Sequence, residues 1–308
     1  MDILTSATTQ ARPQYGVIVH PDSGLPLPVH EHTELEIGFG NGEYTVQYAR
    51  LHPDIFFYGV EISQACVLRC ARRAGGLNNL RLINTDARFM LRELFPDGTL
   101  QRILMQFPCP WSKNADAHKR VTAKDFADGL AAVLKTGGVF EMVTDDEPYA
   151  QEVWNILGVH EALEAENFEV NPQREITTKY ERKWLSEGRN IYRVTFRKSG
   201  AFTVSRRTEQ EMHIKIGRNI TSGDIETLKN TEGKKDKSFW KFGRSFTDGK
   251  MYLLETLTSD DEFEQKFYIH IAPKEEGWLL RLDKTTLAFL TPAVRSAMSD
   301  AAERLSRS

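Results

Sequence analysis

The feature that most constrains the fold is a regular alternation of short apolar runs and helical segments between residues 34 and 196. Parallel strands need a crossover connection, usually a helix, so this rhythm predicts a mostly parallel α/β sheet with helices on both faces, a doubly wound sheet. We expect helices over residues 43–51, 63–74, 87–94, 123–134 and 147–157. The expected strands cover residues 35–37, 56–62, 80–84, 103–107, 139–143, 168–170 and 191–196.

The rhythm stops near residue 197, which indicates a domain boundary. We expect an N-terminal lead-in over residues 1–30, an α/β domain over residues 31–198 and a small C-terminal α+β domain over residues 199–308. In the last domain, residues 203–205, 212–216, 239–246, 251–258, 263–271 and 278–282 favour antiparallel strands, residues 229–238 a mobile loop, and residues 293–305 a closing helix. This domain contains no catalytic motif. Only its attachment to the α/β domain suggests that it adds a surface for RNA.

Composition limits the classes of function. The 308 residues carry a formal net charge of -3, so affinity for nucleic acid must come from a local basic patch. Three cysteines give no disulfide framework, and no apolar run approaches the ~20 residues that span a bilayer. The N-terminus has no apolar core typical of a secretory signal. We therefore expect a cytoplasmic protein without a membrane partner.

A glycine-rich turn follows the first expected strand. Gly38, Gly40 and Gly42 stand at every second position, a spacing that differs from the dinucleotide fingerprint. Glu43 follows at the helix start, where it would repel a diphosphate. Glu36 lies inside the strand end, a costly place for a carboxylate unless it binds something. A cationic ligand fits this turn better than a phosphate.

Acidic residues also end the next two expected strands. Glu61 stands about where a carboxylate accepts from both ribose hydroxyls of a nucleoside. Asp86 stands where a carboxylate could accept from an adenine amino group. The alternative interpretations are a surface acid for Glu61 and a helix N-cap for Asp86, and a cap does not exclude binding. The glycines together with the three acids indicate S-adenosylmethionine as the cofactor.

The most distinctive stretch follows the fourth expected strand, where two prolines stiffen the chain before an aromatic and a basic segment. With this stretch the chain resembles the tRNA (guanine-N7-)-methyltransferase family, of the single-chain bacterial type. The matching pieces keep chain order and cover roughly residues 34 to 198. They are Leu35 to Glu43, Gly59-Val60-Glu61, Thr85-Asp86-Ala87, Phe107-Pro108-Cys109-Pro110-Trp111-Ser112-Lys113, His118-Lys119-Arg120-Val121, Val143-Thr144-Asp145, and Thr178-Lys179-Tyr180-Glu181 with Gly188 and Ile191-Tyr192-Arg193.

The resemblance implies a seven-stranded class I methyltransferase fold, with S-adenosylmethionine as donor and N7 of a guanine in the variable region of tRNA as acceptor. It implies tRNA as partner and leaves open whether the protein is a monomer or a homodimer. Cys109 stands where the family usually has an aspartate treated as catalytic. By position, the cofactor would be held by Glu36, Gly38, Gly40, Gly42, Glu61 and Asp86, and the substrate by Lys113, Asp145, Thr178, Lys179, Tyr180 and Glu181.

The chemistry limits what Cys109 must do. Guanine N7 carries a lone pair and no proton, so methyl transfer needs in-line positioning and no general base. Asp145 and Glu181 remain as acceptors for the guanine edge, and Asp145 is the second candidate catalytic residue. Tyr180 and Trp111 are candidates for stacking on a base, although Trp111 serves equally well as packing.

Two other functions stay open. Cys109 between two prolines suggests a cysteine-dependent pyrimidine C5 methyltransferase, whose cysteine adds covalently to the base. The missing aspartate and a basic segment thinned at residues 114–117 suggest instead a degenerate S-adenosylmethionine- and RNA-binding protein. Cys66 and Cys70, four apart on a helix, are predicted as packed helix cysteines, and no metal site is expected.

Overall fold

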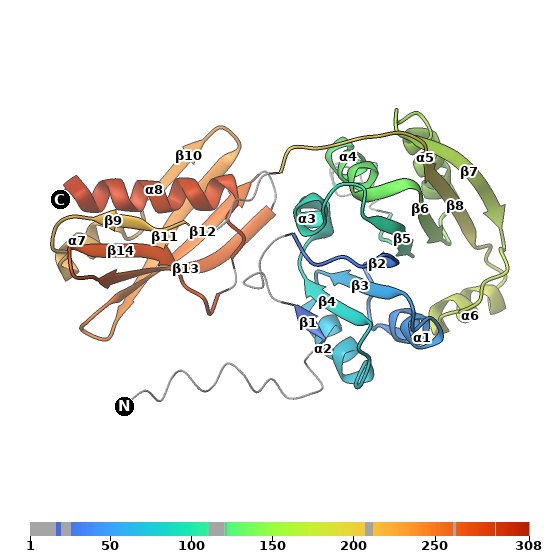
Figure 1. Ribbon diagram of the computed structural model, residues 1–308, viewed down its shortest axis with the longest axis horizontal. Helices are drawn as coiled ribbons and strands as arrows, with labels where there is room; N and C mark the ends of the chain where they lie inside the picture. The colour runs from blue at the N-terminus through green and yellow to red at the C-terminus, as the bar shows by residue number, and fades with distance from the viewer. Residues whose placement is uncertain are drawn as a thin grey trace. The chain divides into compact units, whose positions relative to one another are not determined.

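The computed structural model describes residues 17–19, 26–110, 120, 122–206, 212–260, 263–286 and 288–307. These residues form two compact units, whose boundary in the chain lies between Ser205 and Arg206. We call them the N-terminal unit and the C-terminal unit (Figure 1). No helix of the described ranges is both long enough and apolar enough to cross a membrane.

The N-terminal unit is built on an eight-stranded sheet with the order β1-β4-β3-β2-β5-β6-β8-β7. All pairs are parallel except those that β8 makes with β6 and β7. The doubly wound sheet predicted from the β/α rhythm is confirmed, with one two-residue strand, β1, added at its edge. The strands are β1 (Ile18–Val19), β2 (Thr33–Ile37), β3 (Phe56–Glu61), β4 (Leu80–Asn84), β5 (Leu100–Gln106), β6 (Leu134–Thr144), β7 (Leu163–Val170) and β8 (Tyr192–Lys198).

Three helices of this unit begin at side-chain caps. Asp86 and Asp146 accept from backbone N–H groups in the first turns of α3 and α5, and Thr178 forms a capping box with Glu181 at α6. Helix α6 was not predicted, because it is short and mostly polar. The helices are α1 (Glu43–Leu51), α2 (Gln64–Arg73), α3 (Ala87–Leu94), α4 (Lys124–Val133), α5 (Glu147–Leu157) and α6 (Lys179–Ser186).

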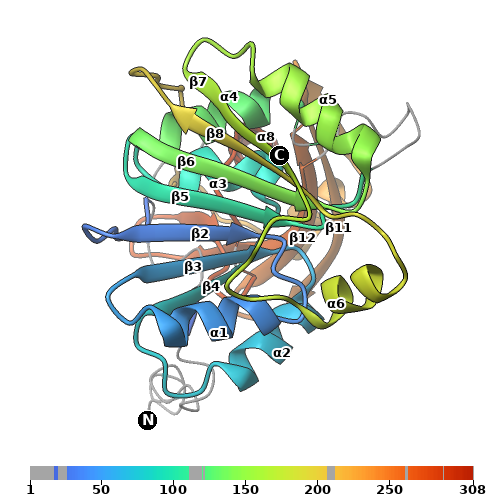
Figure 2. The same ribbon diagram turned by 90° about the vertical axis from the view of Figure 1, so that its right-hand side faces the viewer.

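Packing fixes where the ends of the central strands lie. Helices α1 and α2 pack side by side over β3, and α3 packs against α4. The buried face of α1, with Tyr44, Val46 and Tyr48, joins a core cluster that includes Phe57 and Leu104 of the sheet. Helix α6 lies next to α1, beyond the carboxyl ends of the central strands (Figures 1 and 2). This end of the sheet therefore gathers both the glycine turn and the α6 motif.

The C-terminal unit is an antiparallel six-stranded sheet with the order β10-β11-β12-β13-β14-β9. Helix α8 packs on one face through Val294, Ala297 and Leu305, against a core that includes Trp240 and Phe242. The predicted α+β architecture is confirmed. Its elements are β9 (Ile214–Ile216), α7 (Ser222–Leu228), β10 (Glu232–Lys235), β11 (Ser238–Thr247), β12 (Tyr252–Asp260), β13 (Phe263–Pro273), β14 (Trp278–Leu282) and α8 (Pro292–Arg307).

Two local predictions for the part of the chain after residue 198 are wrong. Residues 229–238 were expected to be a mobile loop, but they contain β10, which pairs with the start of β11. The stretch reads as a loop because β10 is an edge strand whose lysines face water, a common way of protecting a sheet edge. Residues 203–205, expected as a strand, have no regular structure, and helix α7 was not predicted.

Candidate active site

A pocket opens at the carboxyl ends of β2, β3, β4 and β5, the usual place for a ligand in a parallel sheet. One side of it comes from the glycine turn and the strand-end acids, and the other from Pro108 and Cys109 after β5. The lining residues are Ile37, Gly38, Val60, Glu61, Ile62, Thr85, Asp86, Ala87, Arg88, Met105, Pro108, Cys109, Phe126 and Tyr149.

The glycine turn has two kinds of glycine. Gly38 and Gly40 have φ angles of +72° and +55°, and a Cβ at either position would meet nothing within 4 Å. Gly42 has φ +73°, and a Cβ there would lie 2.2 Å from Cys70 Sγ. Gly42 is therefore required by packing against α2, whereas Gly38 and Gly40 leave open space next to the pocket.

Glu61 holds this turn at the end of β3. Its Oε2 accepts from the backbone N–H of Gly40, and its Oε1 accepts from that of Ser63, both at 2.9 Å. Each carboxylate oxygen has a second lone pair, so the side chain can still accept from a ligand in the pocket that it lines. Glu61 therefore lines the pocket with acceptor capacity left for a ligand.

Asp86 is the N-cap of α3, as the alternative interpretation proposed. It accepts from the Arg88 backbone N–H at 2.9 Å, and its Oδ2 pairs with Arg88 Nη2 at 2.6 Å. The other terminal nitrogen of this guanidinium, Nη1, is buried and has no hydrogen-bond partner among the described residues. A donor without an acceptor is costly to bury, and other atoms of Asp86 and Arg88 line the pocket.

Glu36 does not line the pocket. It is 2% exposed on β2, where Oε2 accepts from Thr45 Oγ1 at 2.7 Å and Oε1 accepts from Gln106 Nε2 at 2.8 Å. Burial raises the pKa of Glu36 to about 7, although both hydrogen bonds act in the opposite direction. Glu36 therefore shapes the site from beneath, through α1 and the end of β5.

A chain of buried contacts leads from Glu36 to α6. Gln106 Oε1 accepts from Arg174 Nη2, and Arg174 Nη1 pairs with Glu181 Oε2 at 2.7 Å. The side chains of Arg174 and Glu181 are only 4% and 2% exposed. Glu181 also closes the capping box with Thr178. The Thr178–Glu181 motif is therefore tied to the floor of the site through Arg174.

Three more contacts hold α6. Glu43, at the start of α1, accepts from the Lys179 backbone N–H at 3.2 Å and pairs with Arg182 at 3.3 Å. The Phe107 ring contacts Trp184 with a centroid distance of 4.7 Å. Phe107 has φ +50°, an uncommon conformation for a residue with a Cβ that is typical of functional sites.

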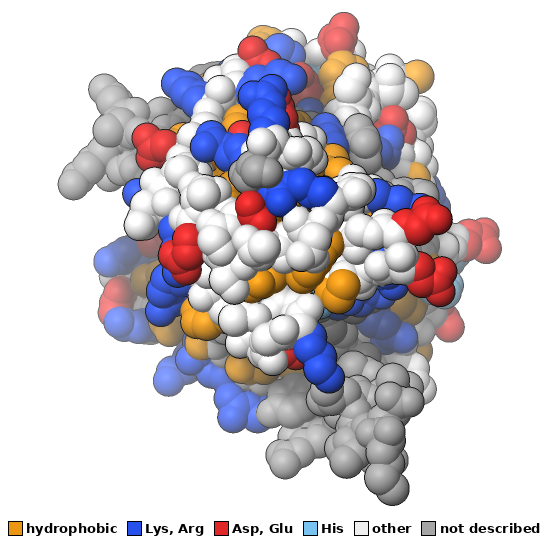
Figure 3. Space-filling view, turned by 90° about the vertical axis from the view of Figure 1, so that its left-hand side faces the viewer, with side chains coloured by type: hydrophobic (Ala, Val, Ile, Leu, Met, Phe, Trp, Pro, Cys, Tyr) orange, Lys and Arg blue, Asp and Glu red, His pale blue; other side chains and the backbone are white. Residues whose placement is uncertain are grey.

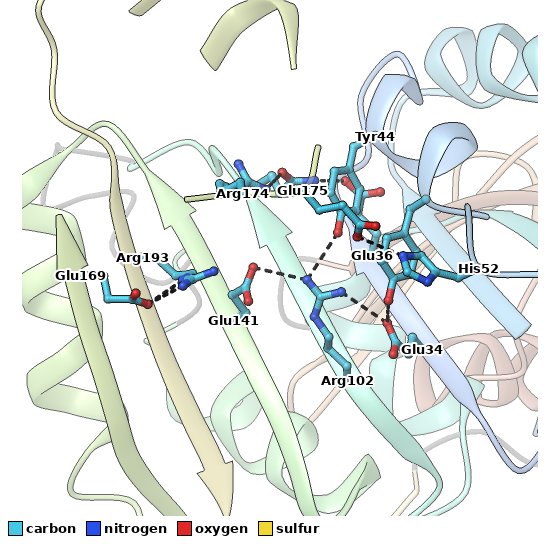
Figure 4. Close-up of polar contacts among 12 residues, drawn as sticks. Glu34, Glu36, Tyr44, His52, Arg102, Glu141, Glu169, Arg174, Glu175 and Arg193 are labelled. Carbon is cyan, nitrogen blue, oxygen red and sulfur yellow. Dashed lines mark hydrogen bonds and ion pairs between the residues drawn. The ribbon is translucent and has the colours of Figure 1, made fainter. Parts of the chain in front are cut away.

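A second buried cluster lies beside Glu36 on the sheet. Arg102 of β5 contacts Glu34 at 3.4 Å, Glu141 at 3.3 Å and the Tyr44 hydroxyl at 3.3 Å, and Tyr48 donates to Glu34 at 2.8 Å (Figure 4). Burial acts to lower the pKa of Arg102, but Tyr44 and the two glutamates outweigh it and raise that pKa well above its ordinary value. This cluster fixes the strand that ends in Gln106.

The remaining predicted site residues lie after β5, after β6 and on α6. Cys109 is exposed and lines the pocket. Asp145, after β6, pairs with the exposed Arg189 at 3.0 Å, and Tyr180 of α6 is 59% exposed. Residues 111–119 and 121 lie outside the described part of the chain, so Trp111, Lys113 and most of the basic segment receive no structural description.

Sequence reasoning missed Gln106 and Arg174. Gln106 looks like the polar end of a strand, and Arg174 lies in an irregular stretch before the Thr-Lys-Tyr-Glu motif. Arg174 has no helical or strand periodicity to point at it, and its partners lie far away in the chain. The one available signal was a glutamate in Thr-Lys-Tyr-Glu at the spacing of a capping box, which predicts a helix start there.

The residues of the pocket fit S-adenosylmethionine. Open space over Gly38 and Gly40 admits a ligand close to the backbone, Glu61 offers acceptors for hydroxyls, and Asp86 and Arg88 give the pocket a polar lining at the end of β4. Apart from β1, the strand order and the antiparallel β8 are those of class I methyltransferases. Fold and pocket together define a class I S-adenosylmethionine-dependent methyltransferase.

Comparison with known proteins identifies the family. A family model described as "Putative methyltransferase" matches residues 30–194. The tRNA (guanine-N(7)-)-methyltransferase of Thermotoga maritima is 37% identical over 88% of this chain and 88% of its own, and that of Aquifex aeolicus is 30% identical over 89% and 94%. The chain belongs to the tRNA (guanine-N(7)-)-methyltransferase family. A solved 16S rRNA (adenine(1408)-N(1))-methyltransferase from Catenulisporales acidiphilia covers 59% of this chain and 92% of its own, at 18% identity and a TM-score of 0.44.

Proposed function

We propose that this enzyme transfers a methyl group from S-adenosylmethionine to N7 of a guanine in the variable region of tRNA. The observation that carries the proposal is the pocket in which the glycine turn and Glu61 face Pro108 and Cys109, in a chain of this family. We assign catalysis to residues 31–198. A cytoplasmic location and either a monomer or a homodimer remain predictions.

Gly38, Gly40, Gly42, Glu61 and Asp86 would form the cofactor side of the site. Glu61 is the candidate acceptor for ribose hydroxyls, and Asp86 with Arg88 the candidate pair for the adenine edge. Gly42 would act through its packing on α2. Glu36, predicted as a direct contact, is proposed here to act indirectly, by placing Thr45 and Gln106.

The acceptor side would be formed by Asp145, Lys113 and the run Thr178, Lys179, Tyr180 and Glu181. Asp145 follows β6, and a guanine edge would replace its exposed partner Arg189. Tyr180, largely exposed, is available for stacking. Glu181 is buried and ion-paired, so its support to the substrate is through the position of α6.

The chemistry asks little of the protein beyond placement. When bound, S-adenosylmethionine supplies an electrophilic methyl group. Guanine N7 is already deprotonated, so the residues need only hold the base in line and exclude water. The base gains positive charge during transfer, which a nearby carboxylate such as Asp145 would stabilise. On this account Cys109 belongs to the platform formed with Pro108 and takes no proton.

The test is transfer of labelled methyl from S-adenosylmethionine to unmodified tRNA, mapped by aniline cleavage at 7-methylguanosine. Cleavage at one guanine of the variable region supports the proposal. Covalent trapping by 5-fluoropyrimidine RNA that disappears in Cys109→Ala would indicate a C5 enzyme instead, and no incorporation at all would indicate a binding protein. Glu61→Ala should lose transfer, whereas Glu166→Gln, which removes an exposed ion pair with Arg197 outside the pocket, should not.

A further inference from the structure

The C-terminal sheet has one face packed on α8 and one that no described helix covers. Side chains alternate between the two faces along each strand. Residues such as Trp240, Leu254 and Phe267 point towards α8 and are buried, and their neighbours point the other way. We call this second surface the open face.

Strand pairing brings basic and apolar side chains into rows across the open face. Lys241 of β11 pairs with Leu257 of β12, which pairs with Lys266 of β13. A second row runs from Phe246 through Leu253 and His270 to Arg281. The first row alternates cations with an apolar group, and the second runs from two apolar residues to His270 and Arg281.

The open face is locally basic in a chain whose net charge is -3. Its described acids are Glu232, Glu255 and Glu264 within the strands, and Asp283 beside Tyr268 and His270 just after β14. Glu255 is bound by two of the cations, Arg244 at 3.2 Å and Lys266 at 2.7 Å, and these contacts lower its pKa to about 2. Its charge is therefore present at neutral pH and already balanced. The cations of the face are Lys215, Lys234, Lys241, Arg244, Lys266 and Arg281.

Aromatic groups lie among these cations. Phe246 is 44% exposed, and its ring meets Tyr268 edge-on at a centroid distance of 5.8 Å. The Arg244 guanidinium lies 5.5 Å from the centre of the Phe246 ring. At the end of the unit shown in Figure 3, exposed apolar side chains lie among basic and acidic ones. A flat sheet with exposed rings and nearby cations suits unstacked bases and the phosphates that join them.

We propose that the open face of the C-terminal sheet is a second RNA-binding surface, which holds tRNA while the N-terminal unit methylates it. Lys and Arg contact phosphates, and Phe246 with Tyr268 accepts an unstacked base of a tRNA loop. This inference rests on the proposed function for the identity of the RNA. A protein partner fits less well, because interface centres are depleted in lysine, whereas lysine lies in the central row here.

The experiment measures binding of unmodified tRNA to the full-length enzyme over a range of KCl concentrations. Lys215→Ala with Lys241→Ala removes two cations of the open face. The matched control, Lys235→Ala with Arg307→Ala, removes two exposed cations from the side of the sheet that carries α8. We expect the open-face pair to reduce the slope of log Kd against log salt by about 2 and the control pair to leave it unchanged.

Phe246→Ala tests the stacking role. We expect its Kd for tRNA to rise at least about 5-fold with an unchanged salt slope, and Phe246→Tyr to keep the affinity of the parent. Methyl transfer at saturating tRNA should keep its kcat in all open-face variants while KM rises. Thermal melts verify folding, and the charge variants keep the test valid if Phe246→Ala unfolds.

Equal Kd values and salt slopes for open-face and control variants would overturn the inference. So would a change in self-association on sedimentation without a change in tRNA affinity, which would assign the face to a second copy of the chain. The proposed function can be rejected independently of this inference. If the parent binds tRNA through the open face but transfers no methyl group, the proposed methyl transfer is wrong and the proposed RNA-binding surface is supported. If instead the parent methylates tRNA and the open-face variants have the same KM and Kd as the parent, the proposed RNA-binding surface is wrong and the proposed methyl transfer is supported.

Discussion

Replacing Arg174 with alanine should destabilise the N-terminal unit far more than an ordinary loss of an ion pair. Arg174 pairs with Glu181 Oε2 at 2.7 Å and donates to Gln106, and both carboxylate and guanidinium are almost fully buried. The variant leaves the Glu181 charge without its partner and the Gln106 oxygen without its donor. Breaking a buried pair by removing one partner costs about 3–5 kcal/mol.

The structure supplies a matched control in the same region. Arg189 pairs with Asp145 at 3.0 Å, but its side chain is 55% exposed. Solvent screens such a pair, so Arg189→Ala should cost no more than about 1 kcal/mol. Arg174→Lys should lie between the two alanine variants, because one ammonium group cannot reproduce the two-sided contact of the guanidinium.

The assay is urea unfolding of the full chain, with amide hydrogen exchange in β2 and β5 as the readout. This readout reports the stability of the N-terminal unit separately from that of the C-terminal unit. A double mutant with Glu181→Gln should cost less than the sum of the single variants, by about 0.5–3 kcal/mol. At an activity level, Arg174→Ala should raise KM for tRNA with little change in cofactor affinity. If Arg174→Ala costs no more than Arg189→Ala, the buried chain from Gln106 to α6 does not hold the helix.

Three other predictions follow from the same region. The pKa of Glu36 is raised from 4.5 to about 7, so the fold favours its protonated form. The free energy of unfolding should therefore fall by up to about 3 kcal/mol as pH rises from 4.5 to 7. In urea titrations run beside the parent, Glu36→Gln should lack this fall. Gly42→Ala should lower the melting temperature more than Gly40→Ala, because both positions have a positive φ but only a Cβ at residue 42 meets Cys70. Adding Cys70→Ala to Gly42→Ala should recover part of the loss. Equal melting temperatures for the two glycine variants would contradict this reasoning. Cys109→Asp should leave the melting temperature unchanged and alter the methyl-transfer rate only modestly, because N7 needs no base; an increase of several orders of magnitude would show that the missing carboxylate matters.

The fold was largely predictable because apolar runs bounded by turns report parallel strands directly. Asp86 as an N-cap was also within reach, since capping is local and depends on residues next to one another. The same holds for the hairpin between β11 and β12, whose turn contains Gly249 with φ +86°. Each of these features is encoded within a few residues.

The contacts of the site were less predictable, because its buried pairs join distant parts of the chain. Gln106 and Arg174 are 68 residues apart, and neither shows by its local sequence that it needs the other. Glu36 was expected in a ligand contact because a carboxylate inside a strand end is costly; the cost is real, but Thr45 and Gln106 offset it. The expectation that the Glu36 carboxylate needs a partner was correct, but the identity of that partner depended on tertiary structure.

All three strand-end acids, Glu36, Glu61 and Asp86, therefore make hydrogen bonds that stabilise the fold, whether or not a ligand is bound. Glu61 accepts from the backbone of the glycine turn through one oxygen and from the Ser63 N–H through the other. Asp86 accepts from a helix start and from Arg88, and both oxygens of Glu36 are taken by Thr45 and Gln106. An amide in place of Glu61 keeps one acceptor oxygen and turns the other position into a donor, which opposes a backbone N–H. Glu61→Gln should thus weaken the glycine turn and cofactor affinity together. A loss of cofactor binding in such a variant does not by itself prove a direct contact, and only a structure or an affinity measured alongside stability separates the two effects.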